Sequence, residues 1–439
     1  METGRKLRVT EHKYDVVIVG GGVAGISAAI EAKSVNPSCS VALMTNEGRI
    51  YSRPALTHAI SRNAKSVDEV AIFSRSTLES VGVKSHLLSK VDSLDSRSKT
   101  IAFRSDSQEQ SVKYGNLVLA TGSKPALPRM PGLELEGVFS TKWAEDAFHV
   151  SNVASPGMRA CVVGAGFIGL ETAQALLRRG LRVTLVEMQP RVLPELLEPD
   201  LSAKVKMQLE MFGVKVLTSS LLQGIHGRRH VQQVTVKGKR LRTDLLAFAT
   251  GVRPNVDLAS TVKVKLGSTG AVATDRTMKT NIESIYSAGD CAETFDLVSG
   301  KPVYRPLGTV AARSGTIAGS NAARKHAEYS GYLRRQYDRI FGIEIVSMGL
   351  SMHQAKSLKI NAEAVPVKPP HYSSPAMSIL RPASALFTAI VEKKSQRIVG
   401  WQAVGAPVRT SWYSRFIQSL IEDKKTLSSL QEQELTVTK

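Results

Sequence analysis

The sequence predicts an α/β protein built on two strand–turn–helix units, and three observations indicate this class. A short β-branched run at 16–19 leads into a glycine-rich turn and then an alanine-rich helical pattern. The same order recurs from residue 160 onward. Between 343 and 405, short runs alternate apolar and polar residues, which is typical of antiparallel strands. A chain of 439 residues is too long for one ordinary core, so we expect two or three domains.

The first turn has the G-x-G-x-x-G pattern in the strand–turn–helix context that binds dinucleotides. Its first glycine allows the tight turn, its second lets the backbone approach a pyrophosphate, and its third lets the helix pack closely on the strand. The helix N-terminus offers N–H groups and a positive dipole to the phosphates. Glu47 follows the second strand, 40–44, where an acid would bind a ribose hydroxyl; the alternative is a solvated loop acid. The residues of this turn are Gly20, Gly21, Gly22, Val23, Ala24 and Gly25.

The second turn repeats the pattern between the strand 160–163 and the helical stretch LETAQALLRRG. Its next strand, LRVTLVE, ends in Glu187. An acid there binds the unphosphorylated ribose of NADH and repels the 2′-phosphate of NADPH, so we expect NADH to be preferred. Arg191 is close enough in sequence to weaken that preference. Two dinucleotide folds indicate two dinucleotides, and hydride transfer between a nicotinamide and a flavin is the simplest use of such a pair.

Three further landmarks follow in order. LVLATGSKP (117–125) and AFATGVRPN (247–255) each lead a strand into a Thr-Gly turn, and IYSAGDCAE (285–293) puts Asp290 at the end of a strand, before a helical stretch. Together with the two glycine-rich turns, this set resembles the FAD-dependent pyridine nucleotide–disulfide oxidoreductase superfamily. The likeness is greatest to the branch of NADH oxidases, coenzyme A-disulfide reductases and rubredoxin or ferredoxin reductases. It spans residues 14–325 and, more weakly, the C-terminal hundred residues.

The resemblance implies two Rossmann-like dinucleotide-binding domains, with the FAD domain split around the NAD domain. The FAD-binding domain would take residues 1–123 and 252–330, and the NAD-binding domain 124–251. Residues 331–439 would form an α+β domain, which usually builds a dimer interface in this family, so a homodimer is expected. Disulfide-reducing relatives usually close with a Tyr- and Pro-rich tail that reaches the partner's active site. This chain ends in LQEQELTVTK, so an active site shared between subunits is not expected.

The resemblance also implies roles for single residues. Thr121, Asp290 and Glu171 have ordinary alternatives as a turn cap, a helix N-cap and a first-turn acid favoured by the helix dipole. FAD would be held by Gly20, Gly21, Gly22, Val23, Ala24, Gly25, Glu47, Arg53, Val91, Ala120, Thr121, Gly122, Gly289, Asp290 and Leu307. The nicotinamide nucleotide would be held by Gly164, Gly166, Phe167, Ile168, Gly169, Glu171, Glu187 and Gly251.

The stretch YSRPALTHAI (51–60) contains no cysteine. In the disulfide- and peroxide-reducing members of the branch, a cysteine at the start of this helix faces the flavin and acts as a thiolate nucleophile. Here an Arg-Pro pair, residues 53 and 54, stands in that region, a pattern that looks like the single-electron-carrier reductases. Arg53, His58 and Glu171 are therefore the candidate catalytic residues. For His58 the alternative is a packing or surface role.

These patterns predict an FAD-dependent NADH oxidoreductase that works without a cysteine relay. Its flavin would take a hydride from NADH and pass electrons to a rubredoxin- or ferredoxin-like carrier, or to oxygen. Two alternatives stay open. One is a redox-sensing flavoprotein that binds a polyanionic partner, and the other is a coenzyme A-disulfide or polysulfide reductase that works without the usual thiol.

Composition narrows the partners and the compartment. The net charge of +20, from 58 basic and 38 acidic residues, suits an acidic electron carrier. The alternative is an ordinary solvated surface, because the basic residues form no long run, and we do not expect nucleic acid as a partner. We expect no membrane span and no secretory signal. Three cysteines without a C-x-x-C pair argue against a disulfide framework and a metal site, and favour a cytoplasmic location.

Overall fold

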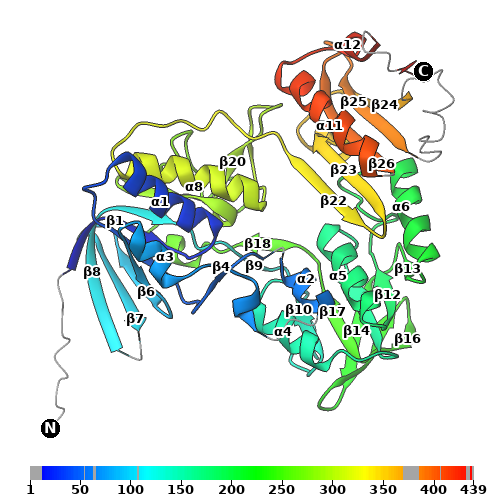
Figure 1. Ribbon diagram of the computed structural model, residues 1–439, viewed down its shortest axis with the longest axis horizontal. Coiled ribbons are helices and arrows are strands. Elements are labelled where there is room, and N and C mark those ends of the chain that lie inside the picture. The colour runs from blue at the N-terminus through cyan, green and yellow to red at the C-terminus, as the bar shows by residue number, and fades with distance from the viewer. Residues whose placement is uncertain are drawn as a thin grey trace.

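The computed structural model describes residues 12–53, 55–62, 66–105, 108–368, 385–405, 407–431 and 436–437. Pro54, which the sequence places in the turn before a helix, lies outside these ranges. Three sheets with their helices follow one another around the molecule in Figure 1, and the third carries the C-terminal helices. None of the described helices is long and apolar enough to cross a membrane.

The first sheet has the strand order β5-β2-β1-β8-β7-β6, with β19 beside β8. Its parallel strands β2, β1, β8 and β19 bring residues near 20, 45, 120 and 288 to one edge. The centre of the sheet is apolar on both faces, since Val16, Val17 and Ile18 are fully buried. The strands are β1 (His12–Val19), β2 (Val41–Met44), β5 (Val83–His86), β6 (Lys90–Asp95), β7 (Thr100–Ser105), β8 (Gln108–Leu119) and β19 (Ile285–Ser287).

Two helices from distant parts of the sequence, α1 (Val23–Val35) and α8 (Gly308–Ala322), lie side by side on this sheet (Figure 1). Glycines on α8 allow the close approach. A Cβ added to Gly315 would lie 2.2 Å from the carbonyl oxygen of Ala24, and one added to Gly319 would lie 2.3 Å from that of Ala28. The helix that follows the first glycine-rich turn is thus buried by the chain after residue 308.

The second sheet is parallel throughout, with the order β10-β17-β11-β12-β13. Its strands are β10 (Val138–Ser140), β11 (Arg159–Val163), β12 (Arg182–Val186), β13 (Lys215–Leu217) and β17 (Leu245–Phe248). Its helices are α4 (Ala144–Val153), α5 (Phe167–Arg178) and α6 (Pro199–Met211). A smaller antiparallel sheet holds β14 (Leu222–Gly227), β15 (Val231–Val236) and β16 (Lys239–Arg242).

The chain crosses between the two large sheets through β9 (Ser123–Pro125) and β18 (Val252–Pro254), which pair antiparallel with each other. The boundaries 123/124 and 251/252 fall in or beside this ribbon, and we keep them as a proposal for the domain limits. Shorter elements are β3 (Ile50–Tyr51), β4 (Ala71–Phe73), α2 (Ala55–Arg62), α3 (Arg75–Ser80), α7 (Asp257–Thr261), β20 (Thr294–Phe295), β21 (Pro302–Val303) and a 3₁₀ turn at Val67–Glu69.

The C-terminal sheet is antiparallel, with the order β22-β23-β26-β25-β24-β27. The apolar–polar runs at 343–405 form four of its strands, and the expectation of antiparallel strands there is confirmed. Its elements are β22 (Arg335–Ile340), β23 (Ile343–Gly349), α9 (Met352–Ser357), β24 (Ala362–Lys368), β25 (Leu386–Glu392), β26 (Ile398–Gly405), α11 (Pro407–Glu422), α12 (Ser428–Gln431) and β27 (Thr436–Val437).

One local expectation is wrong. The sequence IYSAGDCAE suggested a strand followed by a helical stretch. The strand β19 is present, but only one 3₁₀ turn, Gly289–Cys291, follows it, and the chain then enters the short strand β20. Gly289 has a φ of +76°, which favours glycine, and this turn sets its backbone against α1, where a Cβ would lie 2.7 Å from the Ala24 Cβ. Packing against α1 therefore overrides the weak helical pattern.

Candidate dinucleotide-binding and redox site

The two glycine-rich turns have closely matched backbones. Gly20 has a φ of +119° and Gly164 a φ of +102°, a region that favours glycine. A Cβ on Gly20 would lie 2.0 Å from the carbonyl oxygen of Ala120, and one on Gly164 would lie 2.4 Å from that of Ala249. Each first glycine thus lets the turn pass under the end of a neighbouring strand, as the pattern predicts.

The second glycine of each turn faces open space. Gly22 and Gly166 are the N-cap residues of α1 and α5, with the same φ of −76° and ψ of −179° and no side-chain cap. No atom lies within 4 Å of a Cβ built on either residue. Each helix start therefore presents free backbone N–H groups to a space that a side chain would fill, and this fits a pyrophosphate. Val23, which follows Gly22, and Ile168, which precedes Gly169, are exposed.

The residue that ends the second strand differs between the two halves. Glu187 follows β12 and is 7% exposed. Its Oε2 accepts from the Ala165 N–H (2.7 Å) and its Oε1 from the Gln189 N–H (2.8 Å), so the carboxylate holds the turn itself. In the first half the matching residue after β2 is Thr45, whose side chain packs on Gly21. Glu47 lies two residues further and pairs with Arg53.

Arg53 is the centre of a cluster that joins segments far apart in sequence. Its Nη2 donates to Glu47 Oε1 (2.7 Å), and its Nη1 donates to the Lys142 carbonyl (2.7 Å) and the Tyr51 hydroxyl (3.1 Å). The guanidinium also lies over the Trp143 ring, 4.9 Å from its centre. The sequence placed Arg53 and Glu47 near one cofactor, and the structure brings the two together.

Asp290 forms a second cluster. Its Oδ2 accepts from the Ser123 hydroxyl (2.7 Å) and pairs with Lys142 Nζ (3.4 Å), which also donates to Ser123 Oγ (2.7 Å). Burial lowers the pKa of Lys142, and Asp290 opposes that shift. The backbone carbonyl of Lys142 accepts a hydrogen bond from Arg53. Lys142 therefore joins the Arg53 cluster to the Asp290 cluster.

The Thr-Gly turns close both halves in the same way. The Thr121 hydroxyl donates to the Asn255 carbonyl (2.6 Å) and the Thr250 hydroxyl to the Ala126 carbonyl (2.6 Å). Gly122 and Gly251 follow with φ values of +71° and +86°. Each threonine hydroxyl thus bonds to the backbone beside the ribbon of β9 and β18. For Thr121 this matches the alternative role of a turn cap. Cofactor contacts of Thr121, Gly122 and Gly251 stay proposals.

Glu171 lies on α5, one half-turn beyond Gly169, and is half-buried on the helix that packs against α2 and β22. Its Oε2 accepts from the Thr57 hydroxyl of α2 (3.2 Å), and its carboxyl lies within hydrogen-bonding reach of Asp338 on β22. Burial, with the hydrogen bond and charge of Asp338, raises the pKa of Glu171 to about 9, although the Thr57 hydroxyl opposes this. His58 is exposed, so Thr57 is the α2 residue that contacts Glu171, and a catalytic role for His58 stays a prediction.

The remaining candidates lie in several parts of the structure. Ala120 is buried at the end of β8, and its N–H donates to the Val19 carbonyl. Leu307 is the N-cap residue of α8, and Val91 lies in β6, both half-buried. Phe167, the first residue of α5, packs against the core of the second sheet. In the described part of the chain, no group of three or more His, Cys, Asp or Glu could hold a metal ion.

The three cysteines lie in the interior, each outside α2. Cys39, Cys161 and Cys291 are all buried and free of disulfides. Burial raises the pKa of Cys39, and it raises that of Cys161 to about 12. Cys291 contacts the carbonyl oxygens of Leu119 and Ala288. A thiol becomes a nucleophile as an accessible thiolate. All three thiols are enclosed, and burial favours the neutral form of Cys39 and Cys161.

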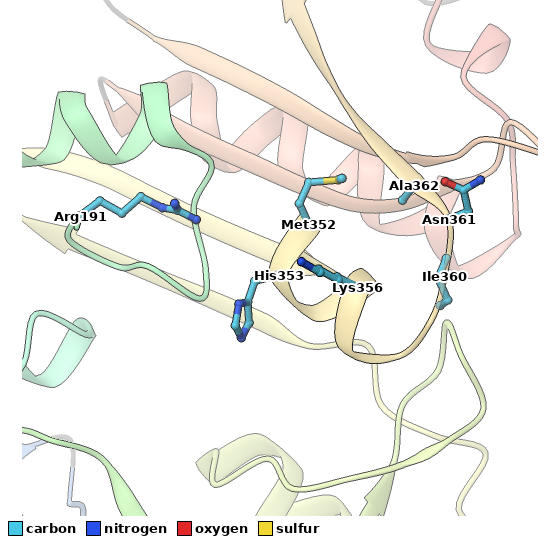
Figure 2. Close-up of a pocket in the computed structure, with 7 residues that line it drawn as sticks. All are labelled: Arg191, Met352, His353, Lys356, Ile360, Asn361 and Ala362. Carbon is cyan, nitrogen blue, oxygen red and sulfur yellow. The ribbon is translucent and has the colours of Figure 1, made fainter. Parts of the chain in front are cut away.

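The Arg191 side chain bonds within its own loop and extends toward α9 (Figure 2). Its Nη2 donates to the Pro194 carbonyl (3.1 Å), and Figure 2 shows its side chain reaching from its loop toward α9. There it lines a pocket of about 400 Å³ with Met352, His353, Lys356, Ile360, Asn361 and Ala362. No ion pair joins Arg191 to Glu187 among the described residues. The Glu187 carboxylate at the end of β12 thus accepts from two backbone N–H groups and has no guanidinium partner among the described residues.

Sequence reasoning missed four residues of the site. Ser123 and Lys142 hold Asp290, and Thr57 and Asp338 hold Glu171. Ser123 follows directly after Gly122, so its place at a strand end was a usable signal. Thr57 lies in the stretch 51–60, where only Arg53 and His58 were singled out, and Lys142 and Asp338 lie in segments without a motif. The packing of α2 and β22 on α5, and the loop after β10, bring these three residues to the site.

Comparisons with known proteins agree with this arrangement. The family described as pyridine nucleotide-disulphide oxidoreductase matches residues 14–315. An NADH oxidase of Methanocaldococcus jannaschii is 35% identical over 78% of this chain and 78% of its own length. A CoA-dependent NAD(P)H sulfur oxidoreductase of Pyrococcus furiosus is 31% identical over 90% of this chain and 89% of its own.

A solved structure shows the same architecture. The NAD-dependent persulfide reductase from A. fulgidus superposes with a TM-score of 0.86 at 29% identity, covering 94% of this chain and 78% of that one. The resemblance inferred from the two glycine-rich turns is therefore confirmed, as is the α/β class with Rossmann-like parallel sheets. The chain belongs to the pyridine nucleotide-disulphide oxidoreductase family and is an FAD-dependent NAD(P)H oxidoreductase.

Proposed function

We propose that this enzyme oxidises NADH through FAD and passes the electrons to a one-electron carrier protein or to oxygen, without a cysteine relay. One observation carries the proposal: all three cysteines of the chain are buried, and none lies in the segment 51–60. FAD, when bound, accepts a hydride from NADH as an electron pair and can release the electrons singly. Such a cofactor needs no thiol between donor and acceptor.

The first glycine-rich turn, Gly20–Gly25, is proposed to hold the FAD pyrophosphate. The open Cβ direction of Gly22 and the free N–H groups of α1 support this assignment. Arg53 and Lys142 then place two cations beside Asp290 at the same sheet edge. Cations held this way stabilise negative charge that develops on a bound group without reorganising during the reaction. The N–H groups and the two side chains together would orient the cofactor.

The second turn, Gly164–Gly169, is proposed to hold NADH. Glu187 supports NADH over NADPH because a buried carboxylate that Arg191 does not neutralise repels a 2′-phosphate. Glu171, just beyond the turn, would lie on the nicotinamide side. Most of the rate enhancement would come from holding two rings in register, which can supply several kcal/mol.

The nature of the acceptor rests on charge and on the missing thiol. A net charge of +20 supports docking of an acidic rubredoxin- or ferredoxin-like carrier, since opposite charges steer encounter. Oxygen is the second candidate acceptor, and the name of the M. jannaschii relative favours it. A sulfur reductase would need a route without an accessible thiol, so the P. furiosus relative gives weaker support. We also propose that the enzyme is a homodimer and that it is located in the cytoplasm.

The test is anaerobic stopped-flow absorbance of the FAD-bound enzyme at the visible flavin band. NADH should bleach the band faster than NADPH at equal concentration. The reduced enzyme is then mixed with oxygen, with an acidic rubredoxin or with coenzyme A disulfide. Fast recovery with rubredoxin or oxygen supports the proposal, and recovery only with coenzyme A disulfide overturns it. Bleaching that no acceptor reverses would favour the redox-sensing alternative.

A further inference from the structure

Two carboxyl groups meet where the second sheet joins the C-terminal sheet. Glu171 projects from α5 and Asp338 from β22, and the two elements pack together. The side chain of Gln174, one turn further along α5, accepts a hydrogen bond from the Phe341 N–H at the end of β22. This bond fixes how α5 and β22 lie against each other. The two acids are therefore held against each other by elements of different domains.

This pair needs a proton. Asp338 Oδ1 accepts from the Arg339 N–H (2.7 Å), but Oδ2 is buried and has no donor among the described residues. Glu171 Oε2 already accepts from Thr57. Two carboxylates in contact repel and leave a buried oxygen unsatisfied, whereas one shared proton removes both costs. The geometry thus fits a carboxylic acid that donates to a carboxylate.

The described side chains of α2 and β22 place no positive charge against Glu171. On α2, Thr57 contacts Glu171, and His58 is exposed. On β22, Tyr337 donates its hydroxyl to Glu344, and Arg339 is exposed. Only Asp338 and Thr57 act on the protonation of Glu171 besides burial itself. A nearby cation would have stabilised both carboxylates, and no cation among the described residues acts on Glu171.

We propose that Asp338 is a positioning residue that shares one proton with Glu171 and keeps the Glu171 carboxyl neutral beside the nicotinamide at neutral pH. The first part concerns this chain alone, and the second rests on the proposed binding of NADH at the second turn. Asp338 acts through Glu171 and has no direct part in the reaction. Its role is to set the charge that Glu171 presents.

The charge has a consequence for the two forms of the nucleotide. Hydride transfer converts the neutral nicotinamide of NADH into the cationic ring of NAD⁺. When the pair loses its proton at high pH, the site gains one negative charge, which attracts NAD⁺ more than NADH. A unit charge roughly 10 Å away in a partly solvated site changes affinity about fivefold. The shared proton therefore favours release of the product near pH 7.

The first experiment tests the proton without nucleotide. Infrared difference spectra of the FAD-bound enzyme, titrated from pH 6 to 11, should show a protonated carboxyl that ionises near the pKa of about 9 expected for Glu171. The band should be absent in Glu171→Gln, whose amide donates permanently, and its midpoint should fall in Asp338→Asn. Asp423→Asn, an exposed acid of the C-terminal domain, is the matched control and should change neither. A spectrum that Glu171→Gln leaves unchanged would overturn the proposal.

The second experiment tests the link to the nucleotide. Equilibrium titration should show NAD⁺ binding about fivefold tighter at pH 10 than at pH 7, relative to NADH, and this change should be absent in Glu171→Gln. If the infrared band is present but the affinity ratio does not change, the placement of NADH in the proposed function fails and the shared proton stands. If the band is absent, the pair itself is refuted whatever the affinities.

Discussion

The two glycine-rich turns have almost the same backbone, but the rest of the chain covers them differently. In each, the third glycine touches the first, since a Cβ on Gly25 or Gly169 would lie 1.9 Å from the carbonyl oxygen of Gly20 or Gly164. In each, the first glycine donates to the end of the second strand at 2.8 Å. Local sequence alone therefore builds the same turn twice.

The elements packed around the first turn differ from those packed around the second. Around the first, α8 and the turn at Gly289 pack directly on α1 near Ala24. Around the second, α5 meets α2 and β22, which belong to other parts of the chain. Ser27 of α1 stands where α5 has Glu171. We infer that the enclosed first turn suits a permanently held FAD and the second a nucleotide that exchanges on each turnover.

Substituting the third glycine should separate these roles with the largest effect. Gly25→Ala should destabilise the protein by about 3 kcal/mol or more and abolish FAD retention, because the new Cβ meets a backbone oxygen that cannot move away. Gly169→Ala should lose NADH binding but keep FAD. Flavin absorbance per protein and an NADH titration measure both. Equal FAD loss in the two variants would break the comparison.

Removing Arg53 should weaken the contact that joins the segment 47–53 to Lys142 and Trp143. Arg53→Ala leaves Glu47 half-buried without its partner and leaves the Lys142 carbonyl without this donor. The free energy of unfolding should therefore fall by about 1–3 kcal/mol. Arg49→Ala is the matched control, since its ion pair with Asp68 is exposed and should contribute under about 1 kcal/mol. Denaturant unfolding gives the difference. If both variants lose the same stability, the Arg53 cluster is not structural.

Neutralising Glu187 should affect only the second half. Glu187→Gln keeps one acceptor for the turn but removes the charge, so discrimination against NADPH should fall about tenfold. The ratio of kcat/KM for NADH and NADPH measures it. Thr45→Ser, at the matching position of the first half, should leave that ratio unchanged; a change there would mean that the turns are not separate sites.

The acid pair gives a pH dependence confined to the second half. The folded-state pKa of Glu171 is raised, so its contribution to stability is complete below its unfolded value and is lost as pH rises toward about 9. Between pH 5 and pH 9, the melting temperature of Asp338→Asn should fall by about 2–4 °C less than that of the unsubstituted protein. Calorimetry at both pH values checks this. Parallel curves for the two proteins would contradict it.

Alkylation should have the smallest effect. Iodoacetamide under native conditions should leave NADH oxidation unchanged, because each thiol is buried and burial raises the pKa of Cys161 and Cys39. Mass spectrometry should find the thiols unmodified until the protein is unfolded. If activity is lost in proportion to the modification of one thiol, the enzyme uses that cysteine and the prediction is wrong.

The sequence predicted most of the parts that are local. Both turns, the strands before and after them and the antiparallel C-terminal strands follow from patterns within a few residues, and each is present. The partners of the site acids were not predictable in the same way. Lys142 and Asp338 reach Asp290 and Glu171 from far along the chain, and their contacts depend on how whole elements pack.

Glu47 shows the same limit at close range. An acid soon after the second strand matched the expected ribose ligand, but the strand ends at Met44, so Thr45 takes the position that Glu187 has in the other half. A shift of two residues moves the Glu47 carboxylate to Arg53. The second strand ends at residue 44, as predicted, so the distance of Glu47 from that end, and not an error in the end itself, decides which group the acid faces.

The antiparallel pair β9 and β18 places the two ends of the segment 126–251 one hydrogen bond apart, from the Ala126 N–H to the Gly251 carbonyl at 3.0 Å. A segment with adjacent ends can be inserted into a surface loop at little entropic cost, because the host needs only a short gap. Excision of 126–251, with a short glycine linker across the ribbon, is therefore a realistic route to a one-nucleotide flavoprotein. The excised piece keeps the whole second sheet and the core cluster around Leu246, while its other core cluster loses partners such as Leu56 and Phe341.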